Sequence, residues 1–166
     1  MSSWKERILP AADRTFLPPT FESLSAVRMG KLIHGALEAG FRGEAGDERF
    51  LAVLGASDEE VREASARLRA LQDHPHIGPL LRPPAGEVLN EVEFLDGEGR
   101  IFRVDRLIVE ENRITVVDWK TGLEESSGHR EQVAKYCRIL SALYPGREIR
   151  GRLAYLALER VEEVPW

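Results

Sequence analysis

RITVVDWKTG, residues 113–122, reads as a β-strand whose apolar run ends in an acid and a base. Because successive side chains of a strand point to opposite faces, Asp118 and Lys120 lie on one face. Val117 and Trp119 lie on the other, and apolar residues on both faces predict a central strand. The charged pair is therefore expected where the strand ends, at the rim of the core, where an uncompensated charge is costly.

Carboxylates also interrupt the two strands predicted before this one. The turn-like DGEG and EEN separate three strand-like segments, which predicts an antiparallel meander. The segments are EVLNEVEFL, RIFRVDRLIVE and RITVVDWK, at residues 87–95, 100–110 and 113–120. The second carries Asp105, and the first carries Glu91 and Glu93 on one face, where one of the two can be simply solvated. Three adjacent strands therefore each bring a carboxylate.

Helical periodicity flanks the predicted meander on both sides. The predicted helices cover residues 21–39, 58–72 and 129–144, and a last strand, RGRLAYLAL, covers residues 150–158. Ser57 and Glu60 form a capping box for the second helix, and HPHIGPLLRPP, residues 74–84, is expected to break it. The order α, α, β, β, β, α, β predicts an α/β fold with a central mixed sheet flanked by helices.

Length and composition indicate one globular domain, since the 166 residues are 43% hydrophobic. Residues 1–20 contain three prolines and no clean periodicity, so we interpret them as a lead-in or linker and residues 21–166 as the domain. No run approaches the roughly 18 consecutive apolar residues of a membrane helix, and the N-terminus lacks the apolar core of a signal peptide. We expect a cytoplasmic protein without membrane association.

Charge and cysteine content argue against several classes of protein. The formal charge of −5, from 28 acidic and 23 basic residues, does not by itself suggest a nucleic-acid partner. The single cysteine, Cys137, cannot form a disulfide framework or a four-cysteine zinc or iron–sulfur site within the chain. It falls on the apolar stripe of a predicted helix, and no nucleophile elbow is visible, so catalysis by a nucleophilic serine or cysteine is set aside.

The clustered carboxylates predict a divalent cation. Two unit charges about 4 to 5 Å apart repel by roughly 3–4 kcal/mol at an effective dielectric constant near 20. A hard cation such as Mg²⁺ offsets this repulsion and keeps waters that can become nucleophiles. Lys120 beside the cation could position the attacking water, lower its pKa or stabilise charge on a phosphate oxygen. The pattern thus indicates phosphodiester hydrolysis.

Simpler interpretations exist for each of these residues. Asp118 and Lys120 could form a plain salt bridge at a strand end, but a bridge does not explain Asp105 and Glu91 on the neighbouring strands. A lone helical histidine such as His34 usually serves packing or lies at the surface. The other histidines, His74, His76 and His129, have no acidic partner at ligand spacing and are predicted to be structural or solvated.

Asp105 and Asp118-x-Lys120 on an αβββαβ core resemble the PD-(D/E)XK nuclease superfamily. Further motifs resemble its RecB-type branch, the nuclease domain of bacterial helicase–nucleases such as RecBCD and AddAB. They are Gly30-x-x-x-His34, Glu91 in NEVEF, VDRL, VDWKTG, and Gln132 with Tyr136 in REQVAKY. The resemblance covers about residues 28–158. One departure is Phe102, which stands where the family usually has glycine.

The resemblance implies a role for each motif residue. The ligands of Mg²⁺ or Mn²⁺ would be His34, Asp105, Asp118 and the backbone carbonyl of Trp119. Glu91 would assist and Lys120 would be the catalytic lysine. Gln132 and Tyr136, one helical turn apart, would support the site or contact DNA, although Tyr136 also fits as an ordinary core aromatic and Gln132 as a surface residue.

The resemblance also implies a function and partners. It implies a metal-dependent DNA nuclease, an exonuclease acting in DNA end processing and recombinational repair, without an iron–sulfur cluster. The chain lacks a Walker-type phosphate loop, so the helicase would be another domain or a partner subunit. The competing hypothesis is a catalytically silent module that keeps the fold to guide DNA or hold a partner subunit. The complete acid set and Lys120 favour the enzyme.

Overall fold

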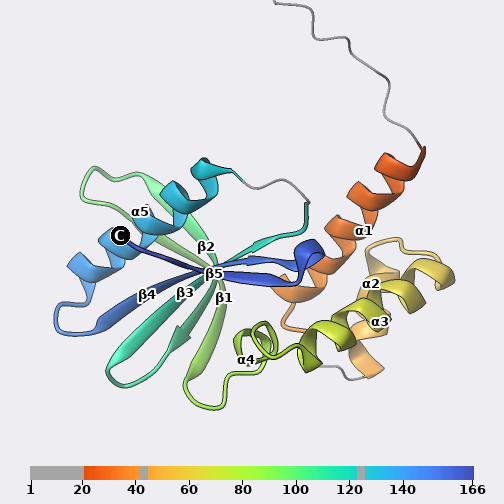
Figure 1. Ribbon diagram of the computed structural model, residues 1–166, viewed down its shortest axis with the longest axis horizontal. Coiled ribbons are helices and arrows are strands. Elements are labelled where there is room, and N and C mark those ends of the chain that lie inside the picture. The colour runs from red at the N-terminus through yellow and green to blue at the C-terminus, as the bar shows by residue number, and fades with distance from the viewer. Residues whose placement is uncertain (1–20, 42–44, 123–125) are drawn as a thin grey trace, which may run out of the picture.

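A computed structural model describes residues 21–41, 45–122 and 126–166, so the predicted lead-in of residues 1–20 lies outside the described residues. Four helices come first: α1 (Phe21–Glu38), α2 (Ala45–Val53), α3 (Asp58–Asp73) and α4 (Gly78–Leu81). They are followed by β1 (Glu87–Leu95), β2 (Ile101–Val109), β3 (Arg113–Lys120), α5 (Ser127–Leu143), β4 (Glu148–Tyr155), the 3₁₀ turn η2 (Leu156–Leu158) and β5 (Arg160–Val164) (Figure 1). No helix in the described part of the chain is long and apolar enough to cross a membrane.

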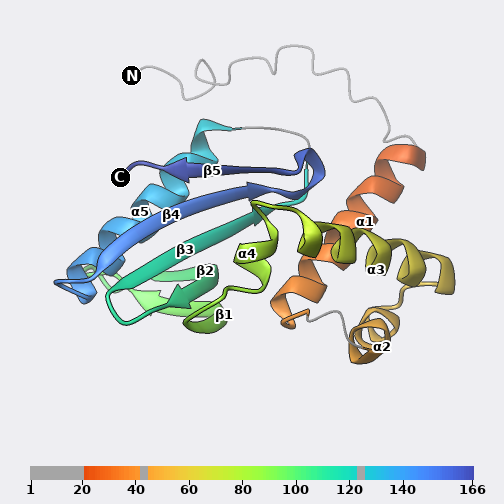
Figure 2. The same cartoon turned by 60° about the horizontal axis from the view of Figure 1, so that its bottom comes forward.

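The five strands form one mixed sheet in the order β1-β2-β3-β4-β5 (Figure 2). The pairs β1–β2 and β2–β3 are antiparallel, which confirms the predicted meander. The chain then crosses over through α5, so that β4 runs parallel to β3 with Asp118 opposite Leu153. β3 is therefore the central strand of the sheet, as its apolar residues on both faces predicted.

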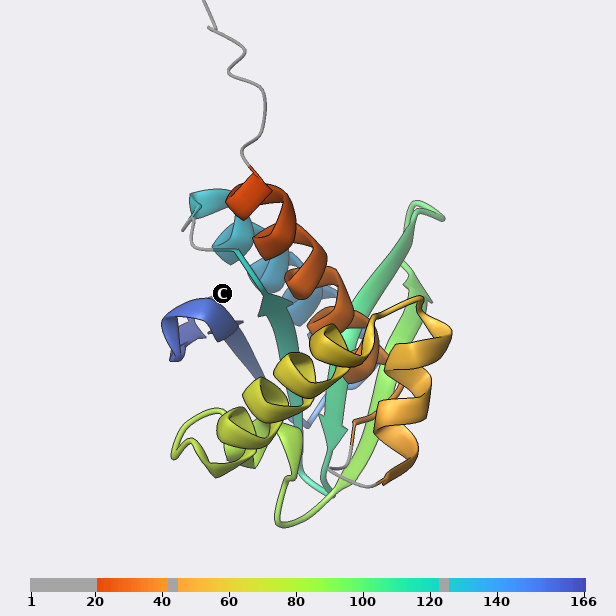
Figure 3. The same cartoon turned by 90° about the vertical axis from the view of Figure 1, so that its right-hand side faces the viewer.

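Helices cover both faces of the sheet. In Figure 3, α1 and α3 lie in front of the strands and α5 lies behind them. The side chains of β3 divide as predicted: Val117 and Trp119 pack into a core with α1, α3 and α4. Ile114 and Val116 pack into a second core with α5. The predicted α/β fold with a helix-flanked mixed sheet is confirmed.

A fully buried arginine, Arg106, ties the helices to the sheet. Its guanidinium donates hydrogen bonds to the carbonyl oxygens of Leu80, Leu81 and Leu37 and to Oδ1 of Asn90, at 3.0, 3.1, 3.5 and 2.8 Å. It also lies over the Trp119 ring, 5.4 Å from the centroid. Burial lowers the pKa of Arg106 to about 10, so the side chain stays charged near neutral pH. One side chain therefore ties the ends of α1 and α4 to β1, β2 and β3.

The predicted number of elements was too small at both ends of the chain. The sequence pattern did not predict α2, because this helix is short and Leu51 is the single fully buried apolar residue among its described side chains. The predicted break at residues 74–84 contains α4, one helical turn with a proline at its start. The predicted last strand ends early, at Tyr155, because the chain turns through η2 and Glu159 takes a left-handed φ of 49°. β5 follows as an edge strand. It was not predicted, because the adjacent acids Glu162 and Glu163 interrupt the alternation of apolar residues typical of a strand.

Candidate active site

The end of β3 holds a nearly buried ion pair. Only 2% of the Asp118 side chain is exposed, and its Oδ2 lies 2.6 Å from Nζ of Lys120. Both side chains are on the face of β3 that packs against α5, as the alternation of the strand predicted. Burial of a carboxylate is unfavourable without compensation, and among the described residues Lys120 is the ion-pair partner of Asp118.

Asp105 lies where β2 and β3 separate. Arg106 opposite Val117 is the last pair of the β2–β3 ladder on this side. Two residues further along β3, the backbone N–H of Trp119 donates to Oδ2 of Asp105 at 2.8 Å. The Asp105 carboxylate thus takes the place of a backbone acceptor and fixes the peptide group between Asp118 and Trp119.

Glu91 faces this point from β1, in a distorted part of the ladder. Asn90 pairs with Arg106 and Val92 pairs with Val104, but the intervening residues Glu91 and Asp105 do not pair. Glu91 has a φ of 51°, a left-handed conformation that costs a non-glycine residue on the order of 1–3 kcal/mol. The side-chain alternation of β2 also breaks here, because Val104 faces α5 whereas Arg106 faces α1 and α4. The distortion therefore coincides with the two acids.

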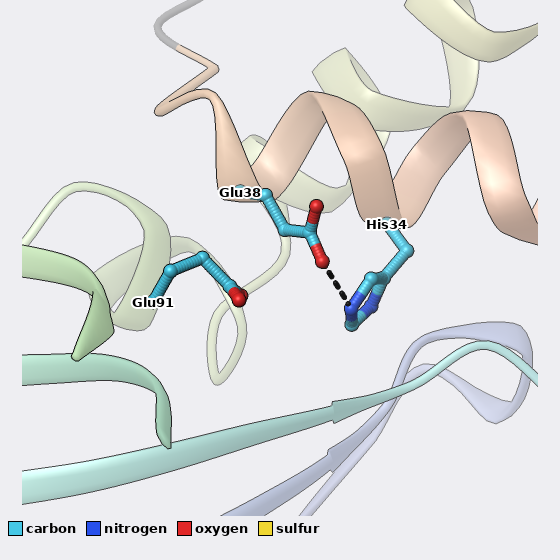
Figure 4. Close-up of side chains that lie close together, drawn as sticks. All are labelled: His34, Glu38 and Glu91. Atoms are coloured by element: carbon cyan, nitrogen blue, oxygen red, sulfur yellow. Dashed lines mark ion pairs between the residues drawn. The ribbon is translucent and has the colours of Figure 1, made fainter. Parts of the chain in front are cut away.

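α1 brings a histidine to the same region. A Cβ on Gly30 would lie 2.9 Å from Oγ1 of Thr121, so glycine lets α1 approach the end of β3 closely. His34 follows one turn later, and its Nε2 lies 3.0 Å from Oε1 of Glu38. His34, Glu38 and Glu91 each offer a ligand atom within 4.8 Å of the others (Figure 4). Asp105 and Asp118 do not join this group of three.

Glu38 is the acidic residue that sequence reasoning missed. It belongs to α1 and lies four residues after His34, so the two side chains share a face of the helix. That spacing was the available signal. The convergence of Glu91 on the same pair was not visible in the sequence, because it depends on the distorted pairing of β1 with β2.

α5 supports Lys120 through a short hydrogen-bond chain. Nζ of Lys120 donates to Oε1 of Gln132 at 3.4 Å, and Nε2 of Gln132 donates to the Tyr136 hydroxyl at 2.7 Å. Tyr136 is buried and makes edge contacts with the rings of Phe94 and Phe102. The residue at the usual glycine position, Phe102, therefore packs against Tyr136, which is at once a core aromatic and a neighbour of the site.

The electrostatics of the site are dominated by acids. Burial and the neighbouring Asp105 raise the pKa of Asp118 to about 6, against the opposing effect of Lys120 and His34. The pKa of Glu91 is also raised, mainly by burial and then by the negative charges of Glu38 and Asp105. Arg103 opposes this increase, since its Nε lies 2.8 Å from Oε2 of Glu91. The repulsion among carboxylates that the sequence predicted is therefore present, and Lys120, Arg103 and His34 compensate it only in part.

The raised pKa of Asp118 makes the metal-free protein less stable at neutral pH. The Asp118 carboxylate binds a proton more tightly in the folded than in the unfolded protein, so its protonation stabilises the fold. This stabilisation is fully present below about pH 4 and is lost as the pH rises through about 6. The difference from the ordinary aspartate pKa of 3.8 corresponds to roughly 2–3 kcal/mol. In chelator, Asp118→Asn is therefore expected to unfold at a higher temperature than wild type at pH 7.5, and the gap should close near pH 4. A variant that melts well below wild type at pH 7.5 would instead identify the pair as a structural salt bridge.

Two hollows adjoin these residues. A cavity of about 440 Å³ is lined by His34, Trp119, Lys120, Thr121, Gly122, Ser126 and His129. A larger groove of about 1440 Å³ shares His34, Thr121 and Gly122 with it and extends between α1 and α3. His129, which the sequence analysis left outside the site, thus lines the cavity beside Lys120. The site is open to a ligand from the side of α1 and the N-terminal end of α5.

The donor set fits a divalent cation. Carboxylate oxygens are the ligands that Mg²⁺ and Mn²⁺ prefer, and imidazole suits the transition metals. Oε1 of Glu91 is buried and has no hydrogen-bond partner among the described residues, and the Asp118 side chain is almost completely buried. A cation would supply the positive charge that these groups lack.

Comparison with known proteins agrees with this chemistry. The family model described as the PD-(D/E)XK nuclease superfamily matches residues 7–165. A search of curated proteins gives no match. The match spans nearly all of the chain, including every strand of the sheet and every residue of the site. With its helix-flanked mixed sheet and its acids beside a lysine on the central strand, the chain belongs to the PD-(D/E)XK nuclease superfamily, whose members are metal-dependent nucleases.

Proposed function

We propose that this chain hydrolyses phosphodiester bonds of DNA at the end of β3, with Mg²⁺ or Mn²⁺. The observation that carries the proposal is the buried Asp118, raised in pKa and paired with Lys120, beside Asp105 and an open cavity. A structural ion pair needs neither a second carboxylate nor a cavity. The superfamily match supports a nuclease.

The proposed metal ligands are Asp105, Asp118, the backbone carbonyl of Trp119, and His34. When bound, a divalent cation polarises the phosphate and lowers the pKa of water. Asp105 orients the backbone here, because it accepts the Trp119 N–H. Glu91 assists by adding negative charge to the site.

Lys120 is the proposed catalytic lysine. Asp118 and Gln132 hold its ammonium group in place at 2.6 and 3.4 Å. From there it can donate a hydrogen bond to a non-bridging phosphate oxygen as negative charge develops in the transition state. Gln132 and Tyr136 support this position, because their hydrogen bond fixes the Gln132 amide.

The finer proposal is an exonuclease that works with a helicase in DNA end processing and recombinational repair. The RecB-type motifs support it, with residues 21–166 as the nuclease domain and residues 1–20 as a lead-in. The excess of acidic over basic residues also supports a helicase partner, since a net charge of −5 gives the isolated chain little long-range attraction to DNA. A helicase that holds the strand would supply the missing affinity through effective concentration. A role like that of the bacterial helicase–nucleases that these motifs resemble implies the cytoplasm as the compartment.

Substrate form tests the exonuclease proposal. We expect end-labelled linear single-stranded DNA to be shortened from an end in Mn²⁺, whereas a covalently closed circle of the same sequence and the matching RNA resist cleavage. Asp118→Asn serves as the inactive control. Linearisation of the circle as fast as the linear strand is degraded would identify an endonuclease, and equal degradation of RNA would remove the DNA preference.

Affinity tests the helicase proposal. The isolated chain is expected to bind single-stranded DNA with a Kd in the non-specific range of about 10⁻⁴ to 10⁻⁶ M, weakening further with salt. Fluorescence anisotropy at low and moderate salt measures this, and the cleavage rate should rise steeply in the intact helicase assembly. Tight, nearly salt-independent binding and full-speed cleavage by the isolated chain would identify a self-sufficient nuclease.

A further inference from the structure

His129, near the start of α5, lines the cavity beside Lys120 but has no part in the function proposed above. The cavity measures about 440 Å³, and its wall includes Lys120 and Thr121 from the end of β3, His34 from α1, and His129. Binding sites for small molecules typically measure about 300–1000 Å³. The cavity therefore has room for a nucleotide, which is more than a cation and one phosphate group occupy.

One face of α5 carries His129 together with the residues that hold Lys120. Gln132 accepts a hydrogen bond from Nζ of Lys120 at 3.4 Å and donates one to the Tyr136 hydroxyl at 2.7 Å. His129 precedes Gln132 by three residues and Tyr136 by seven, which places the three side chains on one face of the helix. The helix that positions Lys120 therefore also presents His129 to the cavity.

Contact with Tyr155 fixes where His129 lies across the sheet. The centroids of the two rings are 6.0 Å apart, and their planes are tilted by 46°. Tyr155 is fully buried on β4 and pairs with Lys120 in the parallel β3–β4 ladder. Asp105 belongs to β2, on the other side of β3, and adjacent strands are about 4.8 Å apart. Lys120 therefore lies between Asp105 and the strand against which His129 packs.

The chemistry of the imidazole ring suits a phosphate. In either protonation state the ring keeps at least one N–H donor, and the oxygens of a phosphodiester only accept hydrogen bonds. Half to two-thirds of the hydrogen bonds between proteins and DNA go to phosphate and sugar. The proposed function places the scissile phosphate at Lys120 and the cation. The phosphate within reach of His129, on the far side of Lys120 from Asp105, is therefore an adjacent one.

We propose that His129 donates a hydrogen bond to the phosphate next to the scissile one and thereby holds the DNA strand across the end of β3. The inference rests on the proposed function, because it extends the same cleavage site by one nucleotide. It gives a binding role to a residue that the sequence motifs do not contain. With a net charge of −5 the isolated chain has little long-range attraction to DNA, so local contacts of this kind carry its affinity.

His129→Phe tests the proposal, because it keeps a ring against Tyr155 and removes the donor. On a short single-stranded oligonucleotide in Mn²⁺, the variant is expected to have a KM about tenfold above that of wild type and a kcat within about twofold. His76→Phe is the matched control, since it makes the same change at an exposed histidine outside the lining of the cavity and should keep the wild-type KM. Thermal unfolding verifies that both variants are folded. Calorimetric titration should give wild-type affinity for Mn²⁺ in both, because neither histidine is a proposed metal ligand.

A neutral methylphosphonate linkage identifies the phosphate. Placed at one of the two neighbours of the scissile phosphate, it should raise the KM of wild type about tenfold but that of His129→Phe less than about threefold, because the contact is already absent there. If the two effects simply multiply at both neighbours, or if folded His129→Phe keeps the wild-type KM, the inference is overturned. The proposed function then still stands, provided that Asp118→Asn abolishes cleavage. A wild-type protein that neither binds nor cleaves DNA in Mn²⁺ would overturn both.

Discussion

Replacing Lys120 by methionine is expected to slow DNA cleavage by at least about a hundredfold, the usual cost of removing one donor to a charge that develops in the transition state. Methionine keeps most of the length of the side chain but removes its charge. Mn²⁺ binding should not weaken, because Lys120 lies beside the acids and repels a cation. Single-turnover cleavage and a parallel Mn²⁺ titration separate the two effects.

Lys135→Met is the matched control for this variant. Lys135 is also on the α5 side of the sheet, but its ammonium lies over the Phe102 ring, 4.3 Å from the centroid, instead of at the acids. The control should therefore retain most of the wild-type rate. A folded Lys120→Met protein that cleaves as fast as the control would show that this lysine is not catalytic.

Arg106→Met is expected to lower the free energy of unfolding by about 3–5 kcal/mol, because it leaves several buried carbonyl groups without a donor. Arg106 is 1% exposed and holds Leu80, Leu81 and Asn90 at hydrogen-bond distance. Arg106→Lys should recover little of the loss, because an ammonium cannot reproduce the planar fork of donors. Urea unfolding measures both variants.

Arg138→Met provides the reference for that measurement. Arg138 is exposed on α5, so its replacement should change the free energy of unfolding by no more than about 0.5 kcal/mol. If Arg106→Met were as stable as this reference, the buried guanidinium would not be what ties α1 and α4 to the sheet.

Local patterns predicted the elements that carry strong local signals. β3 begins and ends where RITVVDWK predicted, because its apolar run is bounded by turns and charges. α3 starts at its capping box, with both reciprocal hydrogen bonds of Ser57 and Glu60 present. α2 and β5 were missed because their stability comes from packing and edge pairing, which composition alone does not reveal.

Residues of the site were predictable where the strand period decides their placement. Asp118 and Lys120 share a face because alternate side chains must, and the structure places them together. Arg106 could not be recognised, because a polar residue in a strand normally reads as solvent-facing. Its burial arises from the change of face at Asp105, which is a property of the paired strands and not of either segment. The approach of Glu91 to Glu38 has the same origin.

Degradation of single-stranded DNA by wild type, Asp105→Asn and Asp118→Asn, in Mn²⁺ and then in excess chelator, tests the central claim most directly. We predict that wild type cleaves only with the divalent ion and that both folded variants lose at least about a hundredfold in rate, because each removes a carboxylate that holds the ion. Cleavage by wild type that persists in chelator, or comparable rates in the folded variants, would contradict the assignment of a metal-dependent nuclease site to the end of β3.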